Sequence, residues 1–157
     1  MSETPEVPET PEMPEVADLP DRLRGLPSRL LALTSARADR VVSERLAAED
    51  ARKWHYAALA SLAEYGPTSQ AGLSRRTGIY RSDLVAVMNE LEAQGHVART
   101  PDPADRRRNV VTITSQGRQH LRRLDKILAD AQDELMAPLS VAERSLLVSL
   151  LERMLAR

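Results

Sequence analysis

The chain has 157 residues, the length of one ordinary domain, and 42% of them are hydrophobic, which is enough to form a core. Only 3% are aromatic and none is Phe, so Leu, Val, Ala and Met must fill that core. The sequence has no Cys, which excludes disulfides, thiolate zinc sites and cysteine redox switches. His55, His96 and His120 show no metal-ligand spacing, so we expect neither a metal nor a cofactor.

The sequence indicates a soluble protein of the cytoplasm. No segment approaches the roughly 20 consecutive apolar residues that span a bilayer, so we expect no contact with a membrane. The N-terminus is acidic and rich in proline, the opposite of a secretory signal peptide.

The net charge of −1 hides an uneven distribution. Residues 1–21 carry seven acidic side chains and no basic one, which leaves 22 basic and 16 acidic side chains in the rest of the chain. Residues 68–123 alone hold ten arginines against five acids. A basic region of this kind suits an anionic partner, nucleic acid first among them, although a merely solvated surface explains the charge equally well.

The first 20 residues form an acidic tail in which "PEVPETPEMPEV", residues 5–16, repeats every three residues. Three residues make one turn of polyproline II, so the glutamates would line one side of an extended, disordered segment. Two interpretations stay open: an inert solubilising tail, or an acidic strip that competes with DNA for the basic part of the chain.

Helices are expected over most of the remaining chain. "DRLRGLP", from Asp21, makes at most one turn because Gly25 and Pro27 interrupt it. Apolar residues at helical spacing then predict helices over 27–48, 54–66 and 80–95, with a short helix capped by Thr68 or Ser69 and ended by Gly78.

Two short strands follow these helices. "HVART" and the β-branched "NVVTIT" flank the loop "PDPADRRRN", residues 101–109, and predict a β-hairpin. Thr114 then caps a helix over 115–137, and "SVAE", residues 140–143, is a capping box that starts the last helix.

This order of elements predicts a mainly α protein with a small β-hairpin, a winged helix-turn-helix flanked by long helices. We expect a domain over 21–157 after the tail at 1–20. Residues 54–114 would form the DNA-binding lobe. The segments 21–48 and 115–157 carry more apolar surface than one small domain needs, so we expect them to join a second copy of the chain as a homodimer.

Residues 27–157 resemble the MarR (multiple antibiotic resistance regulator) family of bacterial transcription factors. The resemblance rests most strongly on "LEAQGHVARTPDPADRRRNVVTITSQG", with its D-x-R wing, and on "AEYGPTSQAGLSRRTGIYRSDL" for the helix-turn-helix. It implies a symmetric dimer with one recognition helix in each of two major grooves of a pseudo-palindromic double-stranded DNA operator. It also implies repression or activation tuned by a small ligand, often an aromatic acid.

The expected wing contacts come from the tip of the hairpin. Arg106, Arg107 and Arg108 can reach a minor groove, where the negative potential is focused, or the phosphates beside it. The resemblance implies that Asp105 orients the guanidinium of Arg107 and that Arg107 enters the groove. The two neighbouring arginines would then contact phosphates.

The expected recognition helix leaves six residues for the major groove: Tyr80, Arg81, Ser82, Val85, Ala86 and Asn89. Family members often carry polar or basic residues where this chain has Val85 and Ala86. Five residues of the preceding helix are expected at the DNA backbone: Thr68, Ser69, Gln70, Arg75 and Arg76.

The segment "RKWHY" is the candidate effector site, because a cation beside aromatic rings can hold an aromatic carboxylate. The candidates are Arg52, Trp54, His55 and Tyr56, although Trp54 and Tyr56 equally suit a core or a dimer contact. A second class of function, a winged-helix adaptor that binds protein, stays open. An enzyme has no support, since no set of nucleophile, base and orienting residue stands out.

Overall fold

The computed structural model describes residues 13–156, so most of the acidic repeat lies outside the described residues. The chain divides into two compact units between Asp39 and Arg40, and each unit is described by itself. Among the described residues, no helix is both long enough and apolar enough to cross a bilayer.

The first unit contains a 3₁₀ turn, η1 (Val16–Asp18), a single turn of helix, α1 (Asp21–Arg24), and the start of α2 (Pro27–Ala47). Arg24 Nη2 donates hydrogen bonds to the carbonyls of Ala17 and Leu19, at 3.1 and 3.0 Å. The end of the segment expected as an unpacked tail therefore has local structure, and Leu19 is buried.

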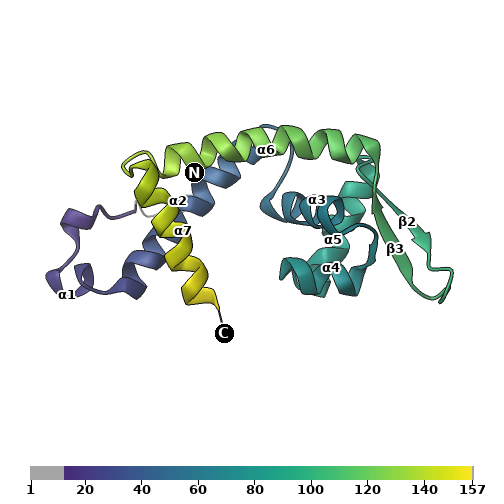
Figure 1. Ribbon diagram of the computed structural model, residues 1–157, viewed down its shortest axis with the longest axis horizontal. Helices are drawn as coiled ribbons and strands as arrows, with labels where there is room; N and C mark the ends of the chain where they lie inside the picture. The colour runs from purple at the N-terminus through teal and green to yellow at the C-terminus, as the bar shows by residue number, and fades with distance from the viewer. Residues whose placement is uncertain (1–12, 157) are drawn as a thin grey trace, which may run out of the picture. The chain divides into compact units, whose positions relative to one another are not determined.

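The second unit contains the remaining helices and all the strands of the described chain (Figure 1). Its elements after α2 are α3 (Lys53–Tyr65), β1 (Thr68–Ser69), α4 (Gln70–Thr77), α5 (Arg81–Ala93), β2 (Val97–Pro101), β3 (Asn109–Ile113), α6 (Ser115–Leu135) and α7 (Val141–Leu155). The expected helices are thus confirmed, with ends that differ by a few residues.

The helices α4 and α5 form the helix-turn-helix. Gly78 ends α4 in the left-handed conformation, φ +73°, which a residue with a Cβ adopts only with strain. Ile79 is buried directly after this turn, and Tyr80 is the N-cap of α5. Leu84, Met88 and other apolar residues of α5 then face the core, which leaves the opposite face of that helix exposed.

The core lies between α3, α4, α5 and the sheet, which together form the lobe expected over residues 54–114. Residues of α2 and α6, outside this lobe, complete the core. Leu46 near the end of α2 and Leu124 in α6 are both fully buried in the same cluster as Leu59 and Leu91. The apolar periodicity of α6 is therefore explained in part by the lobe itself.

The sheet has three strands, so the prediction of a hairpin alone was incomplete. Thr68 and Ser69 pair antiparallel with Val111 and Val110, and β2 pairs with the other side of β3. A strand of two residues is too short to show an alternation of apolar and polar residues. It forms by pairing with β3, which lies some 40 residues further along the chain, so the local sequence does not reveal it.

The last two helices begin with the expected caps. Thr114 Oγ1 accepts the Gly117 N–H at 3.0 Å, and Ser140 and Glu143 form the predicted capping box. Six large apolar side chains of α7 are at least 42% exposed: Val141, Leu146, Val148, Leu150, Met154 and Leu155. The described chain leaves this helix without a buried residue.

Two histidines stack where the wing meets α6. The rings of His96 and His120 lie 4.2 Å apart and nearly parallel, and both side chains are buried. Gly117 permits this close approach, since a Cβ there would stand 2.0 Å from the His96 carbonyl oxygen. Burial lowers the pKa of both histidines below their ordinary value of 6.5, and the neighbouring charge of Arg123 lowers both further.

We predict that stability falls as the pH drops from 7.5 to 5.5. The unfolded histidines take up protons near pH 6.5, whereas the folded ones do so only at lower pH, so protons favour the unfolded state in this window. Urea unfolding at a series of pH values measures the effect. His96→Phe keeps a ring in the stack and removes one titrating group, so its pH dependence should be weaker; an equal dependence in both proteins would contradict the assignment.

Candidate nucleic-acid interface

A basic hollow of about 460 Å³ lies where α4, α5 and the wing meet. Five of its seven lining residues belong to the three groups that the sequence assigned to DNA, and only Ala71 and Asn109 do not; the lining residues are Ser69, Gln70, Ala71, Arg75, Arg81, Arg108 and Asn109. Three of them are arginines and none is an acid. The surface therefore joins the expected backbone, recognition-helix and wing contacts in one positively charged concavity.

The wing tip is held by its own backbone and by two aspartates. Asp102 N–H donates to the Arg108 carbonyl at 2.8 Å, and Arg108 N–H donates to the Asp105 carbonyl at 2.9 Å. Asp102 Oδ1 accepts the Ala104 N–H at 2.9 Å, a local turn that Asp favours. The tip is thus a folded turn that presents Arg106 and Arg107 to solvent.

Asp105 binds different partners from those expected. Its Oδ1 accepts the backbone N–H of Arg107 at 3.1 Å, and its Oδ2 lies 3.5 Å from Nε of Arg108. The expectation that Asp105 orients the guanidinium of Arg107 is therefore not met in this structure. Residues three apart meet across a tight turn, which brings Arg108 to the carboxylate and leaves Asp105 to set the backbone of Arg107.

The N-cap of α5 and its exposed face carry the six residues expected in the groove: Tyr80, Arg81, Ser82, Val85, Ala86 and Asn89. Tyr80 is 79% exposed and Val85 48%, so large apolar surface faces solvent beside the polar groups. Arg81 also lines the basic hollow. Asn89 Oδ1 accepts a hydrogen bond from Arg99 Nη2 at 2.8 Å.

The five residues expected at the DNA backbone separate into different roles. Ser69 caps α4, its Oγ accepting the Gly72 N–H at 3.1 Å, while Thr68 pairs with β3. Gln70 and Arg75 line the basic hollow with Ser69. Arg76 instead lies over the ring of Tyr65, 5.1 Å from its centroid.

Sequence analysis missed Arg99 of β2. Its side chain donates to Asn89 and, through Nε at 3.0 Å, to Glu92 Oε2, and both acceptors belong to α5. This cluster connects the first wing strand, β2, to α5. The contact spans up to ten residues of sequence and crosses from strand to helix, so no local pattern could reveal it.

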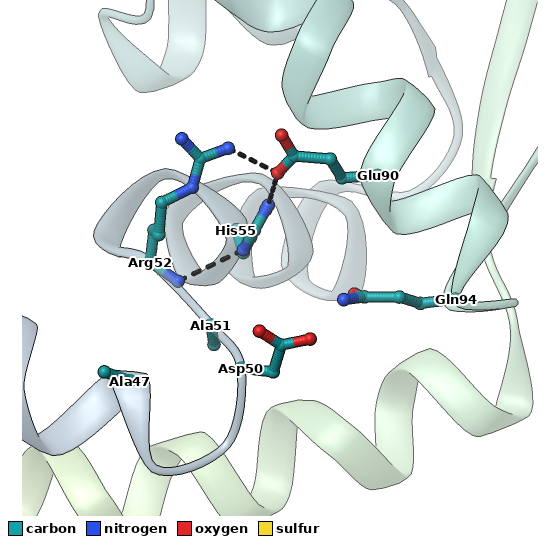
Figure 2. A pocket seen from close by; sticks show the side chains of 7 residues that line it. All are labelled: Ala47, Asp50, Ala51, Arg52, His55, Glu90 and Gln94. Carbon is teal, nitrogen blue, oxygen red and sulfur yellow. Dashed lines mark hydrogen bonds and ion pairs between the residues drawn. The ribbon is translucent and has the colours of Figure 1, made fainter.

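A second hollow, of about 400 Å³, lies on another side of α5 (Figure 2). It is lined by Ala47, Asp50, Ala51, Arg52, His55, Glu90 and Gln94. Arg52 Nη2 is hydrogen-bonded to Glu90 Oε2, and His55 Nε2 lies 2.6 Å from the same oxygen. The two candidate residues Arg52 and His55 are thus brought together here, and Glu90 of α5 completes the group.

The hydrogen bonds of His55 determine which of its ring nitrogens carries the proton. His55 Nδ1 accepts the Arg52 backbone N–H at 3.1 Å, so Nε2 carries the proton and donates to Glu90. The hydrogen bonds from Arg52 and then from His55 hold the pKa of the Glu90 carboxyl below its usual value. Glu90 therefore stays charged and links α5 to the start of α3.

Trp54 and Tyr56 do not line this hollow. Both are partly buried against the core, and the Tyr56 hydroxyl donates to Asp125 Oδ1 at 3.0 Å. Burial, more than this hydrogen bond, raises the Tyr56 pKa. The alternative reading of these two residues as packing residues agrees with their placement, and an aromatic cage built from them does not.

The tight-turned helix pair, the three-stranded wing and the basic face together define a winged helix-turn-helix domain. Residues 50–108 match the model of the MarR family. A putative transcriptional regulatory protein for the hcr operon of Thauera aromatica is 35% identical over 99 residues, which is 63% of this chain and 60% of that protein. Over these residues the chain is similar to members of the MarR family.

Solved structures show the same fold. A probable transcriptional regulator from Pseudomonas aeruginosa is 28% identical, with a TM-score of 0.77 over 85% of this chain and 99% of that one. The PcaV transcriptional regulator from Streptomyces coelicolor, solved with its natural ligand, is 25% identical, with a TM-score of 0.74 over 84% and 93%. The chain spans about 60% of the length of the curated relative from Thauera aromatica.

We predict that Asp105→Ala loosens the wing tip without unfolding the domain. It removes the acceptor for the Arg107 N–H and the exposed ion pair with Arg108, which together contribute about 1 kcal/mol. Amide hydrogen exchange should accelerate several-fold at Arg107 and stay unchanged in α6. Asp105→Asn, the matched control, keeps Oδ1 and should protect Arg107; equal exchange in all three proteins would show that the carboxylate does not hold the tip.

Proposed function

We propose that this protein is a dimeric, sequence-specific DNA-binding transcriptional regulator, a repressor rather than an enzyme, acting in the cytoplasm. The observation that carries the proposal is the basic hollow, in which α4, α5 and the wing contribute Arg75, Arg81 and Arg108 without an acidic residue. Phosphate binding depends on such a concentration of arginine.

In this proposal α5 enters the major groove. Arg81 and Ser82 would contact bases or phosphates, and Val85 and Ala86 would contact thymine methyl groups. The N-terminus of α4 would hold a phosphate beside Ser69 and Gln70, because the aligned peptide dipoles place partial positive charge at this end of the helix. Arg107 would enter the adjacent minor groove, with Arg106 and Arg108 at its phosphates.

The proposed dimer would use the exposed apolar face of α7. Leu146, Leu150 and Met154 follow helical spacing and are 42–64% exposed. In a monomer this apolar face would stay in contact with water, so its exposure favours burial against a second copy of the chain. A two-fold dimer presents two recognition helices, so its operator would be a pseudo-palindrome.

We predict that Arg107→Ala weakens binding to DNA selected from a random pool by about 1–3 kcal/mol, the scale of one lost specific contact. The slope of log affinity against log salt should also become shallower, because one positive charge is removed from the DNA interface. Mobility-shift titrations at several salt concentrations measure both quantities.

Arg122→Ala is the matched control, because it removes an equal charge from an exposed position on α6 outside the basic hollow. Binding of Arg107→Ala with wild-type affinity and salt dependence would contradict the wing assignment. Failure of the wild type to retard any fragment at low salt would favour the adaptor function instead.

We also propose that a small anionic effector releases the protein from DNA by entering the second hollow. Arg52 is the group that supports an anion there, and its present partner is the carboxylate of Glu90. An effector carboxylate would compete with Glu90 for this guanidinium and so act on α5 directly. The solved PcaV structure, which contains its natural ligand, supports a small-molecule site in a similar fold.

Trp54, the single tryptophan, lies two residues after Arg52 in the sequence and provides a fluorescence signal for this proposal. We predict that benzoate changes the Trp54 emission in a saturable manner and reduces DNA retardation, while neutral benzamide does neither. Arg52→Gln should weaken the benzoate response about tenfold or more, because one charge-assisted hydrogen bond is lost. An equal response in Arg52→Gln would place the anion elsewhere.

A further inference from the structure

The contact between Asn89 and Arg99 constrains a side chain on the proposed DNA-reading face. Asn89 lies seven residues after Ser82 and three after Ala86, so the three share one face of α5, and all are exposed. Arg99 reaches this face from β2 and donates to Asn89 Oδ1 at 2.8 Å. The amide of Asn89 is therefore held by the wing strand rather than by its own helix.

The chemistry of the guanidinium determines which way this amide turns. Arginine has only donors, so the atom that faces Arg99 must be the carbonyl oxygen of Asn89. The amide NH₂ then remains as the donor that Asn89 offers to a ligand. The positive charge beside Oδ1 also opposes the approach of any second donor to that oxygen.

Glu92 holds Arg99 in this position. Its Oε2 accepts from Arg99 Nε at 3.0 Å as well as from Nη2, and its Oε1 accepts the Arg99 backbone N–H at 3.3 Å. Only 21% of the Arg99 side chain is exposed. The carboxylate thus accepts two hydrogen bonds from the guanidinium and a third from the backbone N–H, which fixes Arg99 more firmly than a single surface ion pair would.

We infer that Arg99 is a positioning residue that makes Asn89 select guanine at one position of each operator half-site. A free asparagine reads adenine through two bonds, accepting from N6 and donating to N7. Arg99 takes up the accepting oxygen, so the held amide matches guanine, whose N7 and O6 are both acceptors. The inference rests on the proposed function, because it assigns a base preference within that DNA interface.

The test compares the base preferences of variants selected from the same random DNA pool. The wild type should prefer guanine at one position of each half-site. Arg99→Met, which keeps the aliphatic stem, should change the ratio of guanine to adenine affinity at that position by about tenfold toward adenine, with the other positions unchanged. Glu92→Gln, which leaves the guanidinium in place with a weaker anchor, should shift the preference in the same direction by less.

Asn89→Ala completes a double-mutant cycle. It should abolish the preference at that position, and adding Arg99→Met to it should have no further effect on base choice. Identical base preferences in the wild type, Arg99→Met and Glu92→Gln would overturn the inference, as would a shift that persists without Asn89. Selection of no DNA by the wild type would instead overturn the proposed function, so the two failures are distinguishable.

Discussion

The pairing of β3 with strands on both of its sides is the constraint on which the rest of the lobe depends. One side of β3 binds Thr68 and Ser69, which lead directly into α4, and the other binds the first wing strand. Val111 pairs with Thr68 on one side and with Arg99 on the other, and its side chain is fully buried in the core. The wing is thereby fixed relative to the helix-turn-helix.

Charged side chains then hold α5 from two directions. Glu90 binds Arg52 and His55 at the start of α3, while Asn89 and Glu92 bind Arg99 of the wing strand. Two of the three acids of α5, Glu90 and Glu92, thus have protein partners on the helix that is proposed to approach DNA. An unpaired carboxylate on this helix would repel the DNA phosphates. Glu90 and Glu92 are instead hydrogen-bonded within the protein, and Glu90 also lines the proposed effector hollow.

Local patterns predicted the elements of the fold, and long-range contacts decided the details of the site. Apolar periodicity located the helices, and Thr114 and Ser140 were recognised as caps because capping depends on residues within one turn. The strand at Thr68–Ser69 and the role of Arg99 depend on distant partners. Within the wing, the resemblance implied that Asp105 orients the Arg107 guanidinium, whereas its carboxylate accepts the Arg107 backbone N–H and lies beside Arg108 Nε, because the turn geometry decides which of the adjacent arginines it meets.

Hydroxyl-radical footprinting on the selected operator tests most directly whether the wing and α5 contact the same duplex. The radicals cleave at the sugars that line the minor groove, where Arg107 is proposed to enter. The account predicts two symmetric patches of minor-groove protection, one beside each half-site, which disappear in Arg107→Ala while the bases contacted by α5 stay protected from major-groove methylation. Minor-groove protection that is absent in the wild type, or that is unchanged in Arg107→Ala, would contradict it.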